Sequence, residues 1–165
     1  MTDLALLILR LVTGSLLAAH GAQKLFGWFG GHGLAGTAGW LESLGFRPGR
    51  LWALLAGGCE FLGGLFLALG LFSPVGSLLI AAAMLTAIAK AHWPRLWVTQ
   101  GGFELPLTNL AVAAAVGIAG PGAYALDALW SSALSPELAQ WGLLLVLVGW
   151  VLALLASSRR PVQPA

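Results

Sequence analysis

Residues Leu4–Ala22 read LALLILRLVTGSLLAAHGA, an apolar stretch that carries Arg10 in its middle. A helix rises about 1.5 Å per residue, so ~20 residues cross the ~30 Å hydrocarbon core of a bilayer. A second stretch of this kind, Leu51–Phe72, carries Glu60 near its centre. A charge in hydrocarbon costs ~3 kcal/mol on insertion scales, and it persists where it pairs or faces a protein interior. These two charges are therefore the first candidates for function.

The composition of the whole chain indicates an integral membrane protein. Its 165 residues suit one domain, 59% of them are hydrophobic and only 8% are charged, whereas roughly a quarter of a soluble domain is charged. The net charge is +2 and the basic residues lie between apolar segments, so the sequence does not indicate a nucleic-acid partner. The single Cys59 excludes an internal disulfide, and we interpret it as a buried, inert thiol. The partner that the composition predicts is the lipid bilayer.

Five apolar segments predict an all-α fold, a transmembrane helical bundle. They are about Leu4–Leu25, Arg50–Phe72, Pro74–His92, Phe103–Ala119 and Leu138–Ala156. Each is long enough, or nearly so, to cross a membrane. Between the first two, Leu34–Leu44 predicts a short helix that lies on the membrane surface.

Lysine and arginine predict the orientation of the bundle. They occupy the first loop, the third loop and the C-terminal tail: Lys24, Arg47, Arg50, Lys90, Arg95, Arg159 and Arg160. The other loops carry none. Because cytoplasmic loops are enriched in Lys and Arg, we expect the N-terminus outside and the C-terminus in the cytoplasm.

Polar and small residues recur at helical spacing on the first four segments. The four predicted faces are Arg10, Thr13, Gly14, Gly21 and Lys24; Ala53, Gly57, Glu60 and Gly64; Gly76, Ala83, Thr86 and Lys90; and Glu104, Thr108, Ala111 and Ala115. Small residues let helices approach closely, and polar residues face the interior of a bundle. We therefore expect these faces to point inward. The last segment has no such face and is expected at the periphery.

From depth along the helices we expect Arg10 and Glu60 to pair, directly or through one water. A structural ion pair between two helices is the alternative to a catalytic role. We expect the ionisable groups nearer the cytoplasm to converge with Glu60 on one cavity: His20, Lys24, His92 and Glu104. The alternatives are that Lys24 is an interfacial anchor and that His92 and Glu104 lie at the water boundary. Without H-x-x-x-H spacing, we do not expect a metal site.

The motifs resemble those of the DoxX family of small bacterial membrane proteins. The resemblance rests on Arg10 with Gly14, on His20-Gly21-Ala22-Gln23-Lys24-Leu25-Phe26-Gly27, on Phe29-Gly30-Gly31, on Glu60 with Gly63-Gly64, on His92, on Gly102-Phe103-Glu104, and on Gly120-Pro121-Gly122 with Leu126-Asp127. It implies a four-helix membrane domain over residues 1–129. Residues 130–165 would then add a C-terminal transmembrane helix and a basic tail.

The resemblance also implies a membrane subunit of a quinone-linked oxidoreductase or an oxidative-stress complex in the inner membrane. A quinone would be the cofactor, with Arg10, His20 and Lys24 binding it and with Glu60, His92 and Glu104 as catalytic residues. Quinone reduction takes up protons, which titratable groups supply. Electrons would come from a redox protein partner or a bound flavin. The alternatives are a non-catalytic scaffold for a redox enzyme and a carrier of small solutes or protons; either form allows a homo-oligomer.

Overall fold

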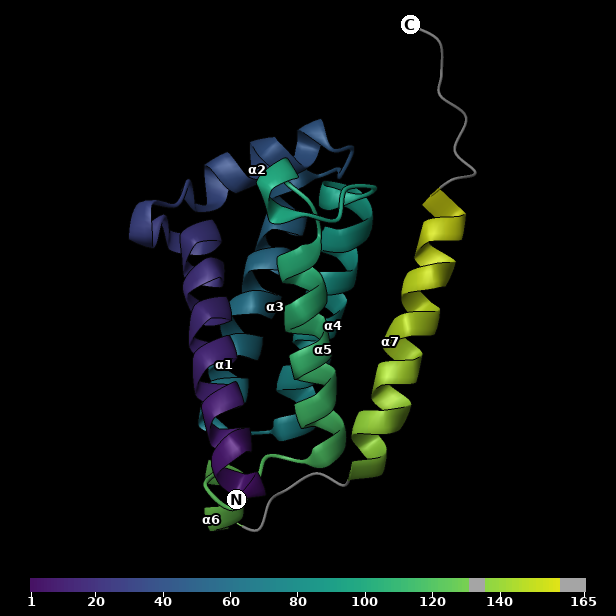
Figure 1. Cartoon of the computed structure of the whole chain (residues 1–165). Helices are drawn as coiled ribbons and strands as arrows, with labels where there is room; N and C mark the ends of the chain where they lie inside the picture. The colour runs from purple at the N-terminus through teal and green to yellow at the C-terminus, as the bar shows by residue number, and fades with distance from the viewer. Residues whose placement is uncertain (131–135, 158–165) are drawn as a thin grey trace, which may run out of the picture.

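The computed structural model describes residues 1–130 and 136–157, and every element in these ranges is helical. The chain runs through α1 (Thr2–Phe26), η1 (Trp28–Gly30), α2 (Gly33–Ser43), α3 (Gly49–Leu69), α4 (Ser73–Thr86), η2 (Ala87–His92), η3 (Val98–Gln100), α5 (Glu104–Ala119), α6 (Leu126–Trp130) and α7 (Pro136–Ser157). Helices α1, α3, α4 and α5 form the bundle, α2 lies across one end of it, and α6 lies at the opposite end (Figure 1). The predicted all-α bundle is confirmed, including the short surface helix.

Among the residues that the structure fully describes, three helical segments are long and apolar enough to cross a membrane: Thr2–Phe26, Gly49–Leu69 and Ser73–His92. The third combines α4 with the π-helical turn η2 that continues it. Helix α5 is apolar but shorter. Their outward surfaces carry exposed large apolar side chains, such as Leu16 and Leu62, which lipid tails solvate. The protein is therefore a multi-pass membrane protein.

Glycine lets α1 and α3 pack backbone against backbone. A Cβ added at Gly14 would lie 2.6 Å from the carbonyl oxygen of Gly64, and one added at Gly21 would lie 2.3 Å from the backbone nitrogen of Phe61. No side chain fits at either point. This spacing is the small-residue packing typical of transmembrane helices. It also fixes how far one helix is slid along the other, and so which side chains of α1 and α3 can meet.

The apolar core lies between α1, α3, α4 and α5. It consists of Leu17, Leu67, Ile80, Met84, Ala113 and Val116. Each bundle helix contributes at least one of these residues. The core holds the four helices of the bundle together.

The inward faces predicted for α1 and α3 are confirmed. Arg10, Thr13, Gly14 and Gly21 are buried on α1, as are all four predicted positions of α3.

The face predicted for α5 is wrong. Thr108, Ala111 and Ala115 are exposed, and the buried residues of α5 are Pro106, Ala113, Val116 and Gly117. Helix α5 is apolar on all sides, and threonine can satisfy its own hydroxyl on the helix backbone. The Thr108 hydroxyl does so, donating to the Glu104 carbonyl at 2.9 Å. The polar side chain of Thr108 therefore does not have to face the interior of the bundle.

The segment after α5 closes the end of the bundle opposite α2. The carboxylate of Asp127 accepts hydrogen bonds from the backbone nitrogens of Phe72 and Ser73, each at 2.9 Å. It thereby satisfies free N–H groups at the start of α4 from a distant part of the sequence. On α1, Asp3 accepts a hydrogen bond from the Ala123 nitrogen at 2.9 Å. These bonds tie the beginnings of α1 and α4 to the same segment.

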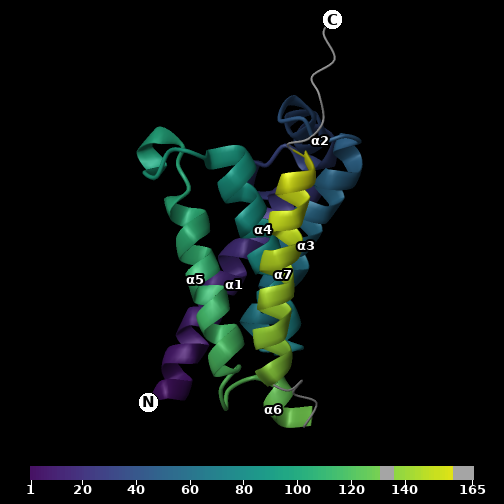
Figure 2. The same ribbon diagram turned by 90° about the vertical axis from the view of Figure 1, so that its right-hand side faces the viewer.

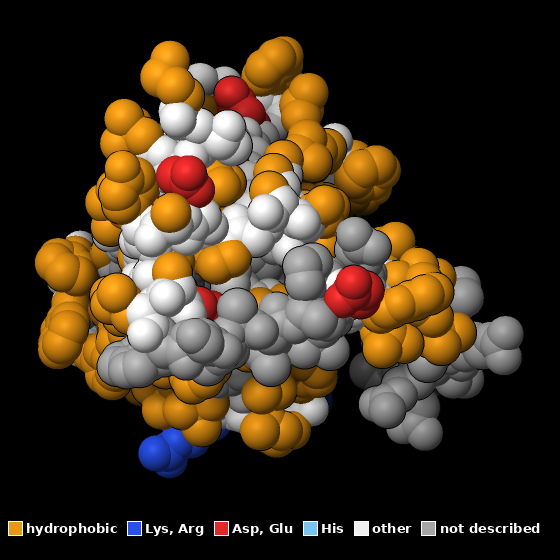
Figure 3. Space-filling view, turned by 90° about the horizontal axis from the view of Figure 1, so that it is seen from below, with side chains coloured by type: hydrophobic (Ala, Val, Ile, Leu, Met, Phe, Trp, Pro, Cys, Tyr) orange, Lys and Arg blue, Asp and Glu red, His pale blue; other side chains and the backbone are white. Residues whose placement is uncertain are grey.

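The two ends of the bundle differ in charge. The face seen from below, where α6 lies, shows acidic side chains among apolar ones, with Lys and Arg only at its rim (Figure 3). The helix ends and loops that carry Lys24, Arg47, Arg50, Lys90 and Arg95 all lie at the α2 end (Figure 1). Apart from Arg10, the described basic residues are thus gathered at one end, as the predicted orientation requires. Arg159 and Arg160 lie outside the described residues, and the orientation itself stays a prediction.

Helix α7 lies beside α4 on the outside of the bundle (Figure 2). The approach is close at Gly142, where an added Cβ would lie 2.6 Å from the side chain of Leu78. The predicted fifth segment is therefore a helix at the periphery. Its crossing of the membrane and its separation from a domain ending at residue 129 stay predictions.

Candidate functional site

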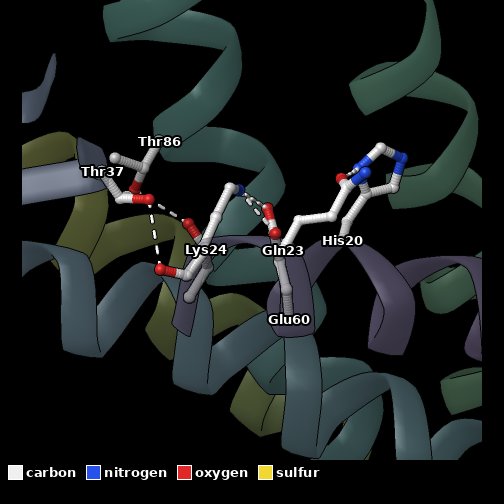
Figure 4. Close-up of polar contacts among 7 residues, drawn as sticks. His20, Gln23, Lys24, Thr37, Glu60 and Thr86 are labelled. Carbon is white, nitrogen blue, oxygen red and sulfur yellow. Dashed lines mark hydrogen bonds and ion pairs between the residues drawn. The ribbon is translucent and has the colours of Figure 1, made fainter. Parts of the chain in front are cut away.

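The pairing expected between Arg10 and Glu60 is wrong, because Glu60 pairs with Lys24. The Lys24 Nζ lies 2.5 Å from each of the two carboxylate oxygens. The Glu60 side chain is only 5% exposed and that of Lys24 is 28% exposed. Figure 4 shows the two side chains meeting between α1 and α3. The buried charge on α3 is therefore neutralised by a lysine near the end of α1.

The position of α1 along α3 explains why Glu60 pairs with Lys24 rather than with Arg10. Gly21 packs against Gly57 and Phe61, so Glu60 lies level with the last turns of α1. Arg10 is 14 residues before Lys24, which is about 21 Å along a helix. The pairing of Arg10 with Glu60 was expected from the depth of each residue along its own helix. The two helices begin at different heights, so equal depths along them do not correspond to the same level in the bundle.

Arg10 belongs to the opposite end of the bundle. Its Nη2 donates a hydrogen bond to the Tyr124 carbonyl oxygen at 3.0 Å, and the nearby carboxylate is that of Asp127. The side chain is only 1% exposed and packs against Gly70. Arg10 therefore holds the closing segment in place. The cofactor-binding role predicted for it stays a prediction.

A slot of 240 Å³ lies between α3 and α4 beneath α2. Its lining is almost entirely apolar, and the Lys24–Glu60 pair lies on its inner side. The lining residues are Lys24, Trp40, Leu41, Leu44, Phe46, Trp52, Leu55, Ala56, Cys59, Glu60, Ala82, Ala83, Thr86, Ala87, Lys90 and Ala91. An apolar cavity with a few convergent polar groups is the usual form of a small-molecule site. We refer to it below as the slot.

The two walls of the slot have different characters. The α4 and η2 wall is built largely from alanine, whereas the opposite side includes Trp40, Trp52 and Phe46. The rings of Phe46 and Trp52 are 5.1 Å apart. A smooth wall of small residues facing aromatic rings suits a flat, apolar molecule.

Helix α2 is held over the slot by polar contacts from its middle and from its last turn. The Thr37 hydroxyl donates a hydrogen bond to the Lys24 carbonyl oxygen at 3.2 Å (Figure 4). The Glu42 carboxylate accepts a hydrogen bond from the Gly49 nitrogen at 3.0 Å, at the start of α3. Leu41 faces inward and is 7% exposed. The end of the slot near the membrane surface is thus covered by a fixed helix.

The other residues expected at one common cavity do not line the slot. His20 is exposed and its Nδ1 lies 3.1 Å from the Gln23 side-chain oxygen, pointing away from Lys24 in Figure 4. His92 Nδ1 lies 2.7 Å from the Gly101 carbonyl oxygen. Glu104 accepts a hydrogen bond from the Val98 nitrogen at 3.0 Å. The expected convergence is therefore wrong for these three residues, and their assigned roles stay predictions.

His92 and Glu104 instead shape the loop between η2 and α5. Both bond to backbone groups of that loop, and the Trp93 and Phe103 rings stack at 5.7 Å. Within residues 1–130 and 136–157, no three or more His, Cys, Asp or Glu side chains form a group able to hold a metal ion.

Sequence reasoning missed two kinds of site residue. It interpreted Cys59 as an inert thiol, whereas Cys59 lines the slot beside Glu60. It used Trp40 only as part of a surface helix and Ala83 only as part of an inward face, and it did not use Trp52 or Ala82 at all. The available signal was the spacing of Trp52, Leu55, Ala56 and Cys59 on one face of α3. This face of α3 is as apolar as the faces that contact lipid, so spacing alone does not distinguish a face that lines a cavity from one that contacts lipid.

Comparison with known proteins adds one positive finding. The DoxX family model matches residues 5–93 of the chain, which include α1 to η2 and every residue that lines the slot. No curated protein and no solved structure gives a significant match.

Proposed function

The chain belongs to the DoxX family, and on that premise we propose that it is the membrane subunit of a quinone-linked oxidoreductase system and binds the quinone in the slot. The family suggests a membrane protein associated with redox or oxidative-stress functions. The observation that carries the proposal is the buried ion pair Lys24–Glu60 at the inner side of a largely apolar cavity.

The chemistry of the ion pair suits a quinone oxygen. Lys24 Nζ is a charged donor that can bond to a quinone carbonyl, and hydrogen bonds from charged donors are the strong ones. Reduction adds two electrons and two protons to the ring to give the quinol. Glu60 is a titratable group beside that donor, placed to exchange a proton with the bound oxygen. The apolar walls accommodate the ring.

Electrons must reach the slot from another molecule. The chain has one cysteine and three histidines, too few for an iron–sulfur cluster held by four cysteines. We propose a redox protein partner at the inner membrane that docks on the α2 end, where the slot lies. That end carries the basic loops, so it would be cytoplasmic in the predicted orientation.

Cys59 supplies a direct test, because it is the only cysteine and it lines the slot. The full chain in lipid vesicles is alkylated with N-ethylmaleimide with and without decylubiquinone, and the rate is followed by mass spectrometry. Every ring position of decylubiquinone is substituted, so no ring C–H remains for conjugate addition of the thiol, and mass spectrometry would detect displacement of a methoxy group as an adduct. Bound quinone should slow the alkylation in a saturable way.

Lys24→Met removes the proposed donor and should weaken protection about tenfold or more, as expected for a charged hydrogen bond of ~1.5–3 kcal/mol. Arg95→Met is the matched control, because Arg95 is a cation of the same end that does not line the slot. It should leave protection unchanged. If no concentration of quinone protects Cys59 in the native chain, the quinone site is rejected and the scaffold alternative takes its place.

A further inference from the structure

The slot has one side that faces lipid. Four of its lining residues are exposed: Trp40 on α2, Lys90 on η2, and Trp52 and Leu55 on α3, the last two at 38% and 48%. Trp52 and Leu55 lie on one of the helices long and apolar enough to cross a membrane. Side chains that line a cavity and are also exposed mark where the cavity opens. Here the opening extends from the α2 end onto the outer surface of α3 below α2.

The route from the α2 end is narrowed by a helix held in place. Helix α2 lies over the end of the bundle (Figure 1), tied to Lys24 through Thr37 and to Gly49 through Glu42. Phe46 and Trp52 close the corner between the turn after α2 and the start of α3. On the α3 side, by contrast, the exposed lining residues Trp52 and Leu55 are both apolar.

The size of the slot limits what fits inside. Small-molecule sites usually enclose about 300–1,000 Å³, and the slot encloses 240 Å³. This volume suits a ring system, whereas a long chain attached to the ring must leave through the opening. The alanine wall of α4 and η2 limits the thickness of the ring rather than its length.

We infer that the slot is loaded sideways from the bilayer by a chain-bearing amphiphile, whose flat, hydrogen-bond-accepting headgroup reaches Lys24 while its apolar chain leaves past Trp52 and Leu55. This inference rests on the proposed function and adds a requirement to it. The alkyl chain contributes to binding beyond its effect on partition into the membrane through van der Waals packing at Trp52 and Leu55, because lipid tails already cover this surface and no hydrophobic gain is left. The part of the protein that selects for the chain is the rim at Leu55.

The test compares two fully substituted benzoquinones, decylubiquinone with its chain and duroquinone without one. Protection of Cys59 from N-ethylmaleimide is measured in lipid vesicles, and each quinone is expressed as its measured mole fraction in the membrane. This scale removes the difference in partition. We expect decylubiquinone to protect at a mole fraction at least about tenfold lower, equivalent to ~1.4 kcal/mol.

Leu55→Trp narrows the rim, and Leu54→Trp is its matched control. Leu54 is the neighbouring residue of α3, is 47% exposed and does not line the slot. Leu55→Trp should raise the half-protecting mole fraction of decylubiquinone about fivefold more than it raises that of duroquinone, whereas Leu54→Trp should leave the ratio between the two quinones unchanged. If the Leu55→Trp variant does not fold, the comparison of decylubiquinone with duroquinone on the unmodified protein still tests whether the alkyl chain contributes to binding.

The outcomes separate the inference from the proposal beneath it. Equal protection by both quinones at equal mole fraction would show that the alkyl chain adds nothing to binding. It would overturn the inference of lateral loading while leaving a quinone site in place. Equal effects of Leu55→Trp and Leu54→Trp overturn the assignment of the rim. Protection by neither quinone rejects the proposed function itself, and the inference falls with it.

Discussion

Lys24 and Glu60 join α1 to α3 through an ion pair in which one ammonium nitrogen lies 2.5 Å from both carboxylate oxygens. The carboxylate is almost completely buried, whereas the lysine keeps some contact with solvent. The pair therefore neutralises a charge that would otherwise be costly inside the bundle. It also marks the polar point of the slot, so its energetics concern both stability and binding.

Removing one partner of this pair should destabilise the protein. For Glu60→Gln we expect about 2 kcal/mol, less than the ~3–5 kcal/mol of fully buried pairs because Lys24 is 28% exposed. The double variant Lys24→Met with Glu60→Gln should lose less than the sum of the single variants, by about 1 kcal/mol or more. Thermal unfolding in mild detergent measures all three. Strict additivity would show that the two side chains do not interact.

The glycine contacts between α1 and α3 predict a sharp difference between two positions on one helix. Gly64→Ala places a Cβ 2.4 Å from the backbone nitrogen of Ala18, so the helices must separate, at a cost of about 1–3 kcal/mol. At Gly58 nothing lies within 4 Å of an added Cβ. Gly58→Ala should be neutral or should stabilise the helix by up to about 1 kcal/mol. Similar melting temperatures for the two variants would contradict the close packing.

Asp127 predicts a strong effect at the end opposite α2. Asp127→Ala leaves the Phe72 and Ser73 nitrogens without their acceptor and removes the carboxylate near Arg10. We expect a loss of about 2–4 kcal/mol in stability, since buried unsatisfied donors cost ~1–3 kcal/mol each. Asp3→Ala is the control, because Asp3 makes one hydrogen bond at the same end and is less buried. Its loss should stay near ~1 kcal/mol. The same unfolding assay compares the two, and an equal loss would refute the role of Asp127.

The distribution of basic residues predicts the orientation. A reporter fused after Ala165 should be cytoplasmic, and one inserted at Gly122 should be external, because the Lys- and Arg-rich loops remain inside. Alkaline phosphatase and green fluorescent protein fusions report the two sides independently. The reverse result at both positions would place the slot and its basic end outside.

Much of the fold could be predicted from the sequence, since hydrocarbon imposes strong rules. Long apolar segments must be helical, because a backbone in lipid has to satisfy its own hydrogen bonds. Arg10 and Glu60 had to point inward, so the inner faces of α1 and α3 followed from helical spacing. On α5 this argument failed, because no charge in the middle of the helix distinguishes one side from another.

The candidate site could be predicted only in part. Lys24 and Glu60 were both expected in a cavity and both line the slot, but they were not expected to pair. His20, His92 and Glu104 looked equivalent to Lys24 in the sequence because they also end up near one end of the bundle. Each of the three side chains makes a hydrogen bond within its own loop or turn. Such local hydrogen bonds are difficult to predict from the spacing of residues.

The sequence by itself determined that this is a membrane bundle, where most of its helices run, and which charges cannot face lipid. The tertiary structure alone decided which charges meet and where a cavity opens. The physical reason is the contact of Gly14 and Gly21 with α3, which sets the relative height of two helices to within one turn. That offset brings Glu60 to Lys24 and places the slot beneath α2. It leaves Arg10 at the other end of the bundle, where it donates a hydrogen bond to the Tyr124 carbonyl oxygen.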